Sequence, residues 1–288
     1  MIRSELQSLL KRVYLNGLND YVTIQFINNN SSVSSSFTTS GSVMYGQIVG
    51  TMTGLPTSTI VINNLNEVIN TLNSFSEQII TQYGANYLIV SDNASEIPPV
   101  LNLELVSLSL PRPIKTPEEI QVERLPEEGG FLPLLPAEEE GGVGEPVPLN
   151  FSDIYFEVTG SNNFINSFLT ASAWITSSTI SFDIGEDLFG NRAEYLTINS
   201  ASFNSNNYIT NDEIRFNLHP HFRTGSLSVA NVNSLGGCKY AFDEFKRVLD
   251  SNKTSTYAKF SIEQYGRFLK CYFEEEPLNA SYYLVRIV

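Results

Sequence analysis

Apolar residues recur three and four positions apart in four separate stretches of the chain, a spacing that predicts helices with one buried side. The four stretches are residues 2–14, 65–75, 161–170 and 239–251. In the first of them, the buried side is expected to consist of Ile2, Leu6, Leu9, Leu10 and Val13. Each helix should therefore pack one side against a core and leave its polar side in solvent.

Between these stretches, short runs rich in β-branched and aromatic residues alternate apolar and polar positions, which is typical of strands with one buried face. In the first half they are residues 21–27, a serine-rich stretch ending at Phe37, 43–49, 59–62, 78–82, 87–90 and 101–110. In the second half they are residues 154–158, 179–184, 195–200, 214–218, 226–232, 257–263, 268–274 and 281–288. The sequence therefore predicts an α+β fold of mostly antiparallel sheets.

The same order of helices and strands occurs twice, on either side of a segment that lacks both patterns. Residues 111–148 hold eight of the thirteen prolines and nine glutamates, a composition that disfavours a packed core. At 288 residues the chain is long enough for two domains. We expect two similar domains, 1–110 and 149–288, each with antiparallel sheets and two amphipathic helices, joined by a connector at 111–148.

The charge and the cysteine content narrow the class of protein. The formal net charge of −14 argues against a general nucleic-acid coat protein, although cations gathered on one surface could still meet a polyanion. Two cysteines are too few for a disulfide framework, so a reducing, cytoplasmic compartment is expected. No run approaches 18 apolar residues and the first residues lack the apolar segment of a signal peptide, so no membrane association is expected.

No set of residues points to catalysis. His219 and His221 are the only histidines, and nothing nominates the further ligand that a metal site would need. Gly236 and Gly237 precede the fourth predicted helix, but the rest of the phosphate-loop pattern is absent. We therefore expect no enzymatic activity, no bound metal and no cofactor.

The polar sides of the four predicted helices carry the functional signal. On the second and third helices they are almost wholly Asn, Ser and Thr, whereas the other two helices add cations. These cations are Lys11 and Arg12 from the first helix, with Lys239, Lys246, Arg247 and Lys253 from or beside the fourth. One interpretation is a solvated helix with ion pairs, such as Asp243 with Lys239 and Arg247. The other is a surface that faces a phosphate backbone without gripping it.

The end of the chain provides a short motif. Residues 281–287 read Ser-Tyr-Tyr-Leu-Val-Arg-Ile, which is similar to the Tyr-Tyr-Leu-Ala-Pro-Lys-Ile ending of the eukaryotic clamp, with Val285 and Arg286 in place of Ala-Pro. Together with the order of elements in both halves, this motif resembles the DNA polymerase sliding clamps. That family includes proliferating cell nuclear antigen and the trimeric clamps of tailed phages.

The resemblance implies a homotrimeric ring of six domains whose helices surround duplex DNA and whose sheets form the outside. Such a ring would tether a DNA polymerase without reading sequence, would be placed on DNA by a clamp loader, and would catalyse no reaction. The six cations would face the DNA, and Tyr283 and Val285 would form part of a partner pocket. For a phage-encoded chain, the compartment would be the cytoplasm of the host cell.

A β-rich virion structural protein or adhesin-like protein, with no role in sliding on DNA, is the main alternative. Short strands rich in Asn, Ser, Thr and Tyr would suit such a surface protein equally well. The regular return of four amphipathic helices counts against it, because such proteins rarely need them.

Overall fold

The computed structural model describes the chain in segments, and two compact units emerge from them. The described residues are 2–27, 32–38, 44–52, 59–83, 87–92, 100–104, 149–151, 154–159, 161–173, 178–186, 188–203, 209–218, 222–225, 238–263 and 266–287. The first unit consists of Met1–Ile114, Arg247–Tyr257 and Tyr272–Tyr282. The second consists of Lys115–Lys246, Ala258–Cys271 and Tyr283–Val288.

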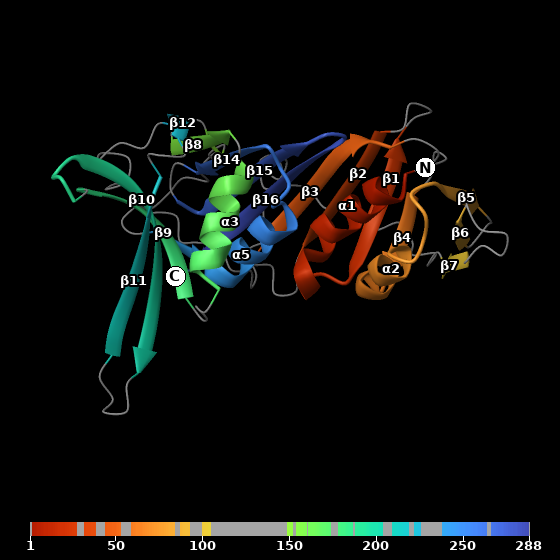
Figure 1. The fold of residues 1–288 in the computed structure, drawn as a ribbon, viewed down its shortest axis with the longest axis horizontal. Helices are drawn as coiled ribbons and strands as arrows, with labels where there is room; N and C mark the ends of the chain where they lie inside the picture. Colours follow the sequence, from red (N-terminus) through yellow and green to blue (C-terminus); the bar gives the residue numbers. More distant parts are fainter. Residues whose placement is uncertain are drawn as a thin grey trace, which may run out of the picture. The chain divides into compact units, whose positions relative to one another are not determined.

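The first unit is built from a four-stranded antiparallel arrangement, a smaller sheet and two helices. The larger group contains β1 (Tyr21–Ile27), β2 (Ser32–Thr38), β3 (Met44–Thr51) and β4 (Thr59–Asn63), paired in the order β4-β1-β2-β3. The smaller sheet contains β5 (Ile79–Tyr83), β6 (Tyr87–Asp92) and β7 (Val100–Glu104). The helices are α1 (Arg3–Tyr14), which a 3-10 turn η1 (Leu15–Gly17) follows, and α2 (Leu65–Leu72). Helix α1 packs against α2 and lies across β1 and β3 (Figure 1).

Strand β3 joins the first unit to the end of the chain by direct pairing. Its partner is β16 (Leu278–Ile287), whose first residues belong to this unit. The backbone N–H of Thr51 donates to Pro277 O at 3.2 Å. A Cβ on Gly50 would lie 2.7 Å from Leu278 Cδ2, so glycine is what permits this close approach of the two backbones.

The second unit contains one long run of paired strands and two further helices. Its strands are β8 (Ile154–Thr159), β9 (Ser178–Glu186), β10 (Arg192–Phe203), β11 (Ile209–Asn217), β12 (Phe222–Gly225), β13 (Lys239–Ala241), and most of β14 (Tyr257–Ile262) with the first half of β15 (Phe268–Glu275). Tyr257 and the residues of β15 from Tyr272 onward belong to the first unit. The strands of this run are paired in the order β11-β10-β9-β13-β16-β15-β14-β8-β12. The helices are α3 (Ser161–Ala171) and α5 (Phe242–Ser251), and the residues of α5 from Arg247 onward belong to the first unit.

Phenylalanine rings form the core beneath α3 and the start of α5. Phe168 of α3 meets Phe245 of α5 edge-to-face, with 5.4 Å between ring centroids. Phe164 approaches Phe260 of β14 at 6.1 Å, and Phe156 of β8 stacks on the same ring at 4.8 Å. The two helices therefore bury their aromatic sides against the strands of this unit.

The predicted α+β class, with antiparallel pairing and two helices in each half, is confirmed, but one helix boundary is wrong. Residues 239–241 form β13 rather than the first turn of the fourth helix. Lys239 pairs with Ile287 and Tyr240 with Ile180, and Tyr240 is fully buried while Lys239 is exposed. This two-residue alternation fits a strand, and the helical stripe begins only at Phe242.

Several predicted segments lie outside the described residues. These are the strand at 226–232, the end of the strand at 101–110 and the connector at 111–148, so the predicted domain boundaries stay a prediction. Strand β12 was not predicted from the sequence. In the described part of the chain, no helix is both long and apolar enough to cross a membrane.

Candidate nucleic-acid interface

Helix α1 presents one free cation to solvent. Its apolar positions from Leu6 to Val13 are buried, as their spacing predicts. Lys11 lies on the exposed side, and no hydrogen bond or ion pair joins it to another described residue. Of the cations predicted on this helix, Lys11 is thus placed where a polyanion could reach it.

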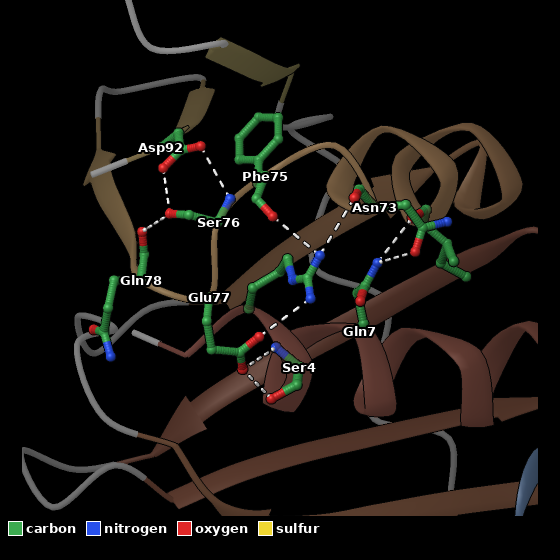
Figure 2. Close-up of polar contacts among 10 residues, drawn as sticks. Ser4, Gln7, Asn73, Phe75, Ser76, Glu77, Gln78 and Asp92 are labelled. Carbon is green, nitrogen blue, oxygen red and sulfur yellow. Dashed lines mark hydrogen bonds and ion pairs between the residues drawn. The ribbon is translucent and has the colours of Figure 1, made fainter. Parts of the chain in front are cut away.

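Gln7, which sequence periodicity assigns to the polar side of α1, is instead buried, with 6% of its surface exposed. Its Nε2 donates to Ile69 O at 3.1 Å and to Asn73 Oδ1 at 2.9 Å (Figure 2). The side chain therefore satisfies the end of the neighbouring helix α2. The polar side of α1 is narrower than the sequence suggests, because α2 covers part of it.

Arg12 is also buried, with 1% of its surface exposed, so it does not face solvent as predicted. Its Nη1 donates to Leu278 O at 3.1 Å, and its Nη2 forms an ion pair with Glu275. Thr254 Oγ1 donates to the same carboxylate at 2.7 Å. Arg12 thus fixes α1 to the end of β15 and the start of β16, and its charge is used inside the first unit.

The end of α5 gathers further charges against the segment after α1. Arg247 Nη1 donates to Asn16 O at 2.5 Å. Asp250 accepts a hydrogen bond from Asn16 Nδ2 and pairs with Lys253 Nζ at 3.2 Å. Among the described residues, Asp243 forms neither of the ion pairs predicted for it. Arg247 and Lys253 are therefore both used in contacts at this surface, although part of each side chain stays in solvent.

In the second unit, Lys246 hydrogen-bonds the C-terminal end of α3. Its Nζ donates to Ser172 O at 3.0 Å and lies 5.5 Å from the centroid of the Phe242 ring. A cation is favourable at a helix C-terminus, where carbonyl groups lack partners. Lys239 of β13 is exposed, and its ammonium group forms no hydrogen bond or ion pair with any described residue. The predicted cations are thus divided between internal contacts and free positions.

The exposed sides of α2 and α3 are dominated by uncharged polar groups. On α3 the exposed residues are Asn162, Asn163, Asn166, Ser167 and Thr170. On α2, Asn70 Nδ2 donates to Asn66 Oδ1 at 3.2 Å, and Glu67 is the one charged residue of that helix. Such amides and hydroxyls can hydrogen-bond phosphate oxygens without adding charge.

Many solved structures match this chain, and three of them cover nearly its whole length as follows. The Proliferating Cellular Nuclear Antigen of Entamoeba histolytica has a TM-score of 0.61 and 10% identity, over 100% of this chain and 97% of its own. The PCNA of A. fulgidus, with the C-terminal region of FEN-1 bound, has a TM-score of 0.61 and 13% identity, over 100% of this chain and 97% of its own. A chain of the PCNA2-PCNA3 complex of Sulfolobus tokodaii has a TM-score of 0.59 and 12% identity, over 99% of this chain and 97% of its own. The chain has the sliding-clamp fold.

The likeness rests on structure alone. No protein-family model matches the sequence, and no curated protein is significantly similar to it. The chain therefore shares the order of helices and strands with these structures, although most of its individual residues differ from theirs.

Near the end of the chain, Tyr283 is buried and two neighbours pack against its ring. The ring of Phe151 meets it edge-to-face at 5.9 Å. Lys270 Nζ lies 5.2 Å from the Tyr283 centroid and 5.7 Å from that of Phe151. Val285 is half-buried and two residues further along the strand, hence on the same face. Sequence reasoning missed Phe151 and Lys270, because neither is near Tyr283 in sequence.

The described residues offer no reactive centre. No group of three or more metal-binding side chains occurs among them, and His219 and His221 lie outside them. Burial raises the pKa of the Cys238 and Cys271 thiols, which keeps both as neutral thiols near pH 7.

Proposed function

We propose that this chain is the subunit of a ring that encircles duplex DNA and tethers a replicative polymerase. The observation that carries the proposal is the clamp fold over the whole chain, combined with helix faces that hold cations and amides on a chain of net charge −14.

The physical argument concerns the strength of the contact. A protein that must move along DNA needs attraction that does not depend on sequence, and contacts with phosphates provide this. An acidic exterior with a weakly basic interior would keep DNA in the hole without holding it at one register. Lys11 and Lys239 are free to take part, and Lys246, Arg247 and Lys253 would add charge nearby. Arg12 is left out because its side chain is buried.

The ring would be a homotrimer that a clamp loader opens and places on DNA. Val285, which is half-buried, would receive part of a polymerase or another replication partner. The buried ring of Tyr283, with Phe151 and Lys270 against it, would support that surface from below. The ring itself would catalyse no reaction, and the tether alone would raise the processivity of the polymerase.

Solution mass gives the first test. Three chains of 32.1 kDa should appear as a particle of about 96 kDa in light scattering. Negative-stain images of that particle should show a central hole. A particle that stays at the mass of one chain at all concentrations would overturn the ring.

Topological retention gives the second test and needs no loader. A linear duplex is attached to a bead by one end, and the protein is allowed to thread over the free end at high concentration. Blocking the free end with streptavidin should then lengthen the residence time many-fold, because the ring can no longer slide off. A residence time that does not depend on the block would contradict encirclement, whatever the affinity.

A further inference from the structure

We propose that the connection between β9 and β10 carries a second docking point for the polymerase, separate from the surface around Val285. The docking point consists of two adjacent apolar residues, Leu188 and Phe189, and is called the apolar tip below. The inference rests on the proposed clamp function, because it takes the polymerase as the partner. It goes beyond that function by assigning a further contact.

The apolar tip holds the two most exposed large apolar side chains in the described part of the chain. Leu188 is 100% exposed and Phe189 is 87% exposed. The other exposed large apolar residues described there lie on strands and show at most 58% of their surface. A single exposed apolar residue is ordinary, whereas two neighbours at the end of a hairpin are typical of a contact surface.

The turn itself does not require two large apolar side chains. Strands β9 and β10 form a long antiparallel hairpin (Figure 1), in which Glu186 pairs with Arg192 and residues 187–191 make the connection. Gly190 has a φ of +78°, which glycine adopts without strain, and Asp187 and Asn191 are also of residue types common in turns. Leucine and phenylalanine are not such types, and neither side chain of the apolar tip is buried in the core. Binding to a partner accounts for both.

The apolar tip is well separated from Val285 within the second unit. Ile180 of β9, Tyr240 of β13 and Arg286 of β16 are aligned across three neighbouring strands. Glu186 is six residues further along β9, hence about 20 Å from that row. Because β9 and β16 run in the same direction, Val285 lies on the opposite side of the row. A folded protein the size of a polymerase can reach both places, and two contacts on one partner reinforce each other.

The charges around the apolar tip select the chemistry of the partner. Residues 183–194 contain two aspartates, two glutamates and one arginine, so four negative charges against one positive charge leave a formal charge of −3. This charge repels the phosphates of DNA and the headgroups of an anionic membrane. It also disfavours a second copy of this chain, whose formal net charge is −14.

The partner that fits is therefore a different protein, with an apolar cleft that has Lys or Arg residues around it. A polymerase carries such cations because it must hold the phosphates of its template. The apolar tip would enter the cleft, and the surrounding carboxylates would face the cations at its edge.

The test measures the affinity of the full chain for the polymerase encoded by the same genome, by titration calorimetry without DNA. Leu188→Ser with Phe189→Ser, the tip variant, removes the apolar tip without changing the charge. The matched control, Tyr21→Ser with Ile80→Ser, removes two apolar side chains that are exposed on β1 and β5. Thermal unfolding and light scattering verify that each variant keeps the fold and the mass of the parent.

We expect the tip variant to bind the polymerase at least about tenfold more weakly, as is usual when an anchor side chain is removed from an interface. The control should bind like the parent. Phe189→Trp reports burial directly, because Trp174 is the only other tryptophan and the parent provides its baseline. Its emission should shift to shorter wavelength when the polymerase is added. The inference is overturned if the tip variant binds like the parent, if the control loses as much affinity, or if the emission does not shift.

Other occupants of the apolar tip would give different results with Phe189→Trp. A shift with phosphatidylserine vesicles, or on raising the concentration of the protein alone, but not with the polymerase, would assign the tip to a membrane or to a second copy. A shift with the clamp loader only would assign it to the loader. Each of these three results would overturn the inference.

Failure of this inference can be told apart from failure of the proposed function. If the parent binds no polymerase, or if the end block does not lengthen its retention on DNA, the proposed function is wrong. If the parent passes both tests and the tip variant performs equally well in both, the proposed function stands and the apolar tip has no part in it.

Discussion

Replacing Glu77 should weaken the joint between α1 and α2, because this side chain caps α1 from a distant part of the sequence. The N-cap residue of α1, Ile2, has no polar side chain to accept from the first free N–H groups. Glu77 supplies both acceptors instead: its backbone O accepts from Arg3 N at 2.9 Å, and its Oε1 accepts from Ser4 N at 3.2 Å and from Ser4 Oγ (Figure 2).

The same joint also closes the end of α2, so the two helices depend on each other. Arg3 Nη1 donates to Asn73 O at 3.3 Å and to Phe75 O at 3.0 Å, which are carbonyls just past α2. Arg3 Nη2 pairs with Glu77 Oε2 at 3.2 Å, so the carboxylate also orients the arginine. Loss of the Glu77 side chain should therefore loosen both helix ends.

The magnitude follows from the cap and from the exposure of the carboxylate. Losing a side-chain N-cap costs about 0.5–2 kcal/mol. The Glu77 side chain is 48% exposed, so water screens its pairing with Arg3 and this part adds well under 1 kcal/mol. We expect Glu77→Ala to lower the free energy of unfolding by about 1 kcal/mol, or the Tm by about 2–4 °C. Glu77→Gln keeps an acceptor and should lose about half as much.

The pH dependence gives the sharper measurement. The hydrogen bond from the Ser4 hydroxyl holds the pKa of Glu77 below its ordinary value of 4.5, with help from Ser4 N and Arg3. A carboxyl whose pKa is lower in the folded state stabilises the fold above its unfolded pKa, and this contribution disappears as pH falls through the folded pKa. Thermal unfolding of the parent and of Glu77→Gln should therefore differ at pH 7, and the difference should shrink as pH falls below 4.5 and through the lower folded pKa of Glu77.

Asp20→Asn is the matched control, because it removes an exposed carboxylate that has no side-chain partner among the described residues. It should leave the Tm almost unchanged at both pH values. The reasoning fails if Glu77→Ala is as stable as the parent at pH 7. It also fails if the gap between the parent and Glu77→Gln is the same at pH 3.5 as at pH 7.

Three further predictions concern other contacts. Gly50→Ala should lower the free energy of unfolding by about 1–3 kcal/mol in denaturant titration, since the new methyl group would collide with Pro277 and its neighbour. Glu275→Ala leaves the Arg12 guanidinium buried without its carboxylate, so a loss of about 3 kcal/mol is expected, and a neutral result would mean that water reaches Arg12. Lys11→Glu should weaken equilibrium binding to a duplex with free ends at low salt, with mass and Tm unchanged; equal binding would remove α1 from the DNA surface.

The elements could be predicted from the sequence because each has a strong period. The stripe of α1 and the stripe of α2, with Leu65, Val68, Ile69 and Leu72, are buried where the spacing places them. Strand β1 has its predicted bounds, Tyr21–Ile27, because its alternation ends at a run of asparagines. Burial that repeats every two residues in a strand, or every 3.6 in a helix, produces a matching period of apolar residues in the sequence. The fold class can be predicted from that period.

The candidate surface could be predicted only in part, because the state of a cation depends on distant partners. Arg12 is polar and adjacent to Lys11, and its acceptors, Glu275 and Leu278, lie more than 260 positions away. The sequence predicts a helix at Lys239 because the helical stripe of Phe242 follows directly, whereas sheet pairing through Tyr240 makes that segment a strand. A sequence pattern reports which side of an element is apolar, but it does not report which polar groups another element will cover.

The division of the cations has a consequence for how DNA contact should be measured. Lys246 and Arg247 donate to carbonyls of Ser172 and Asn16, so a charge reversal there removes a structural contact together with any attraction for DNA. Only positions such as Lys11 and Lys239, which are exposed and unpaired in the described segments, separate the two effects. If these two supply the phosphate contacts, the salt slope of binding should not exceed about 2 per chain. A steeper slope would mean that Lys246 and Arg247 leave their carbonyls when DNA is present, and carbonyl-directed hydrogen bonding would then compete with DNA binding.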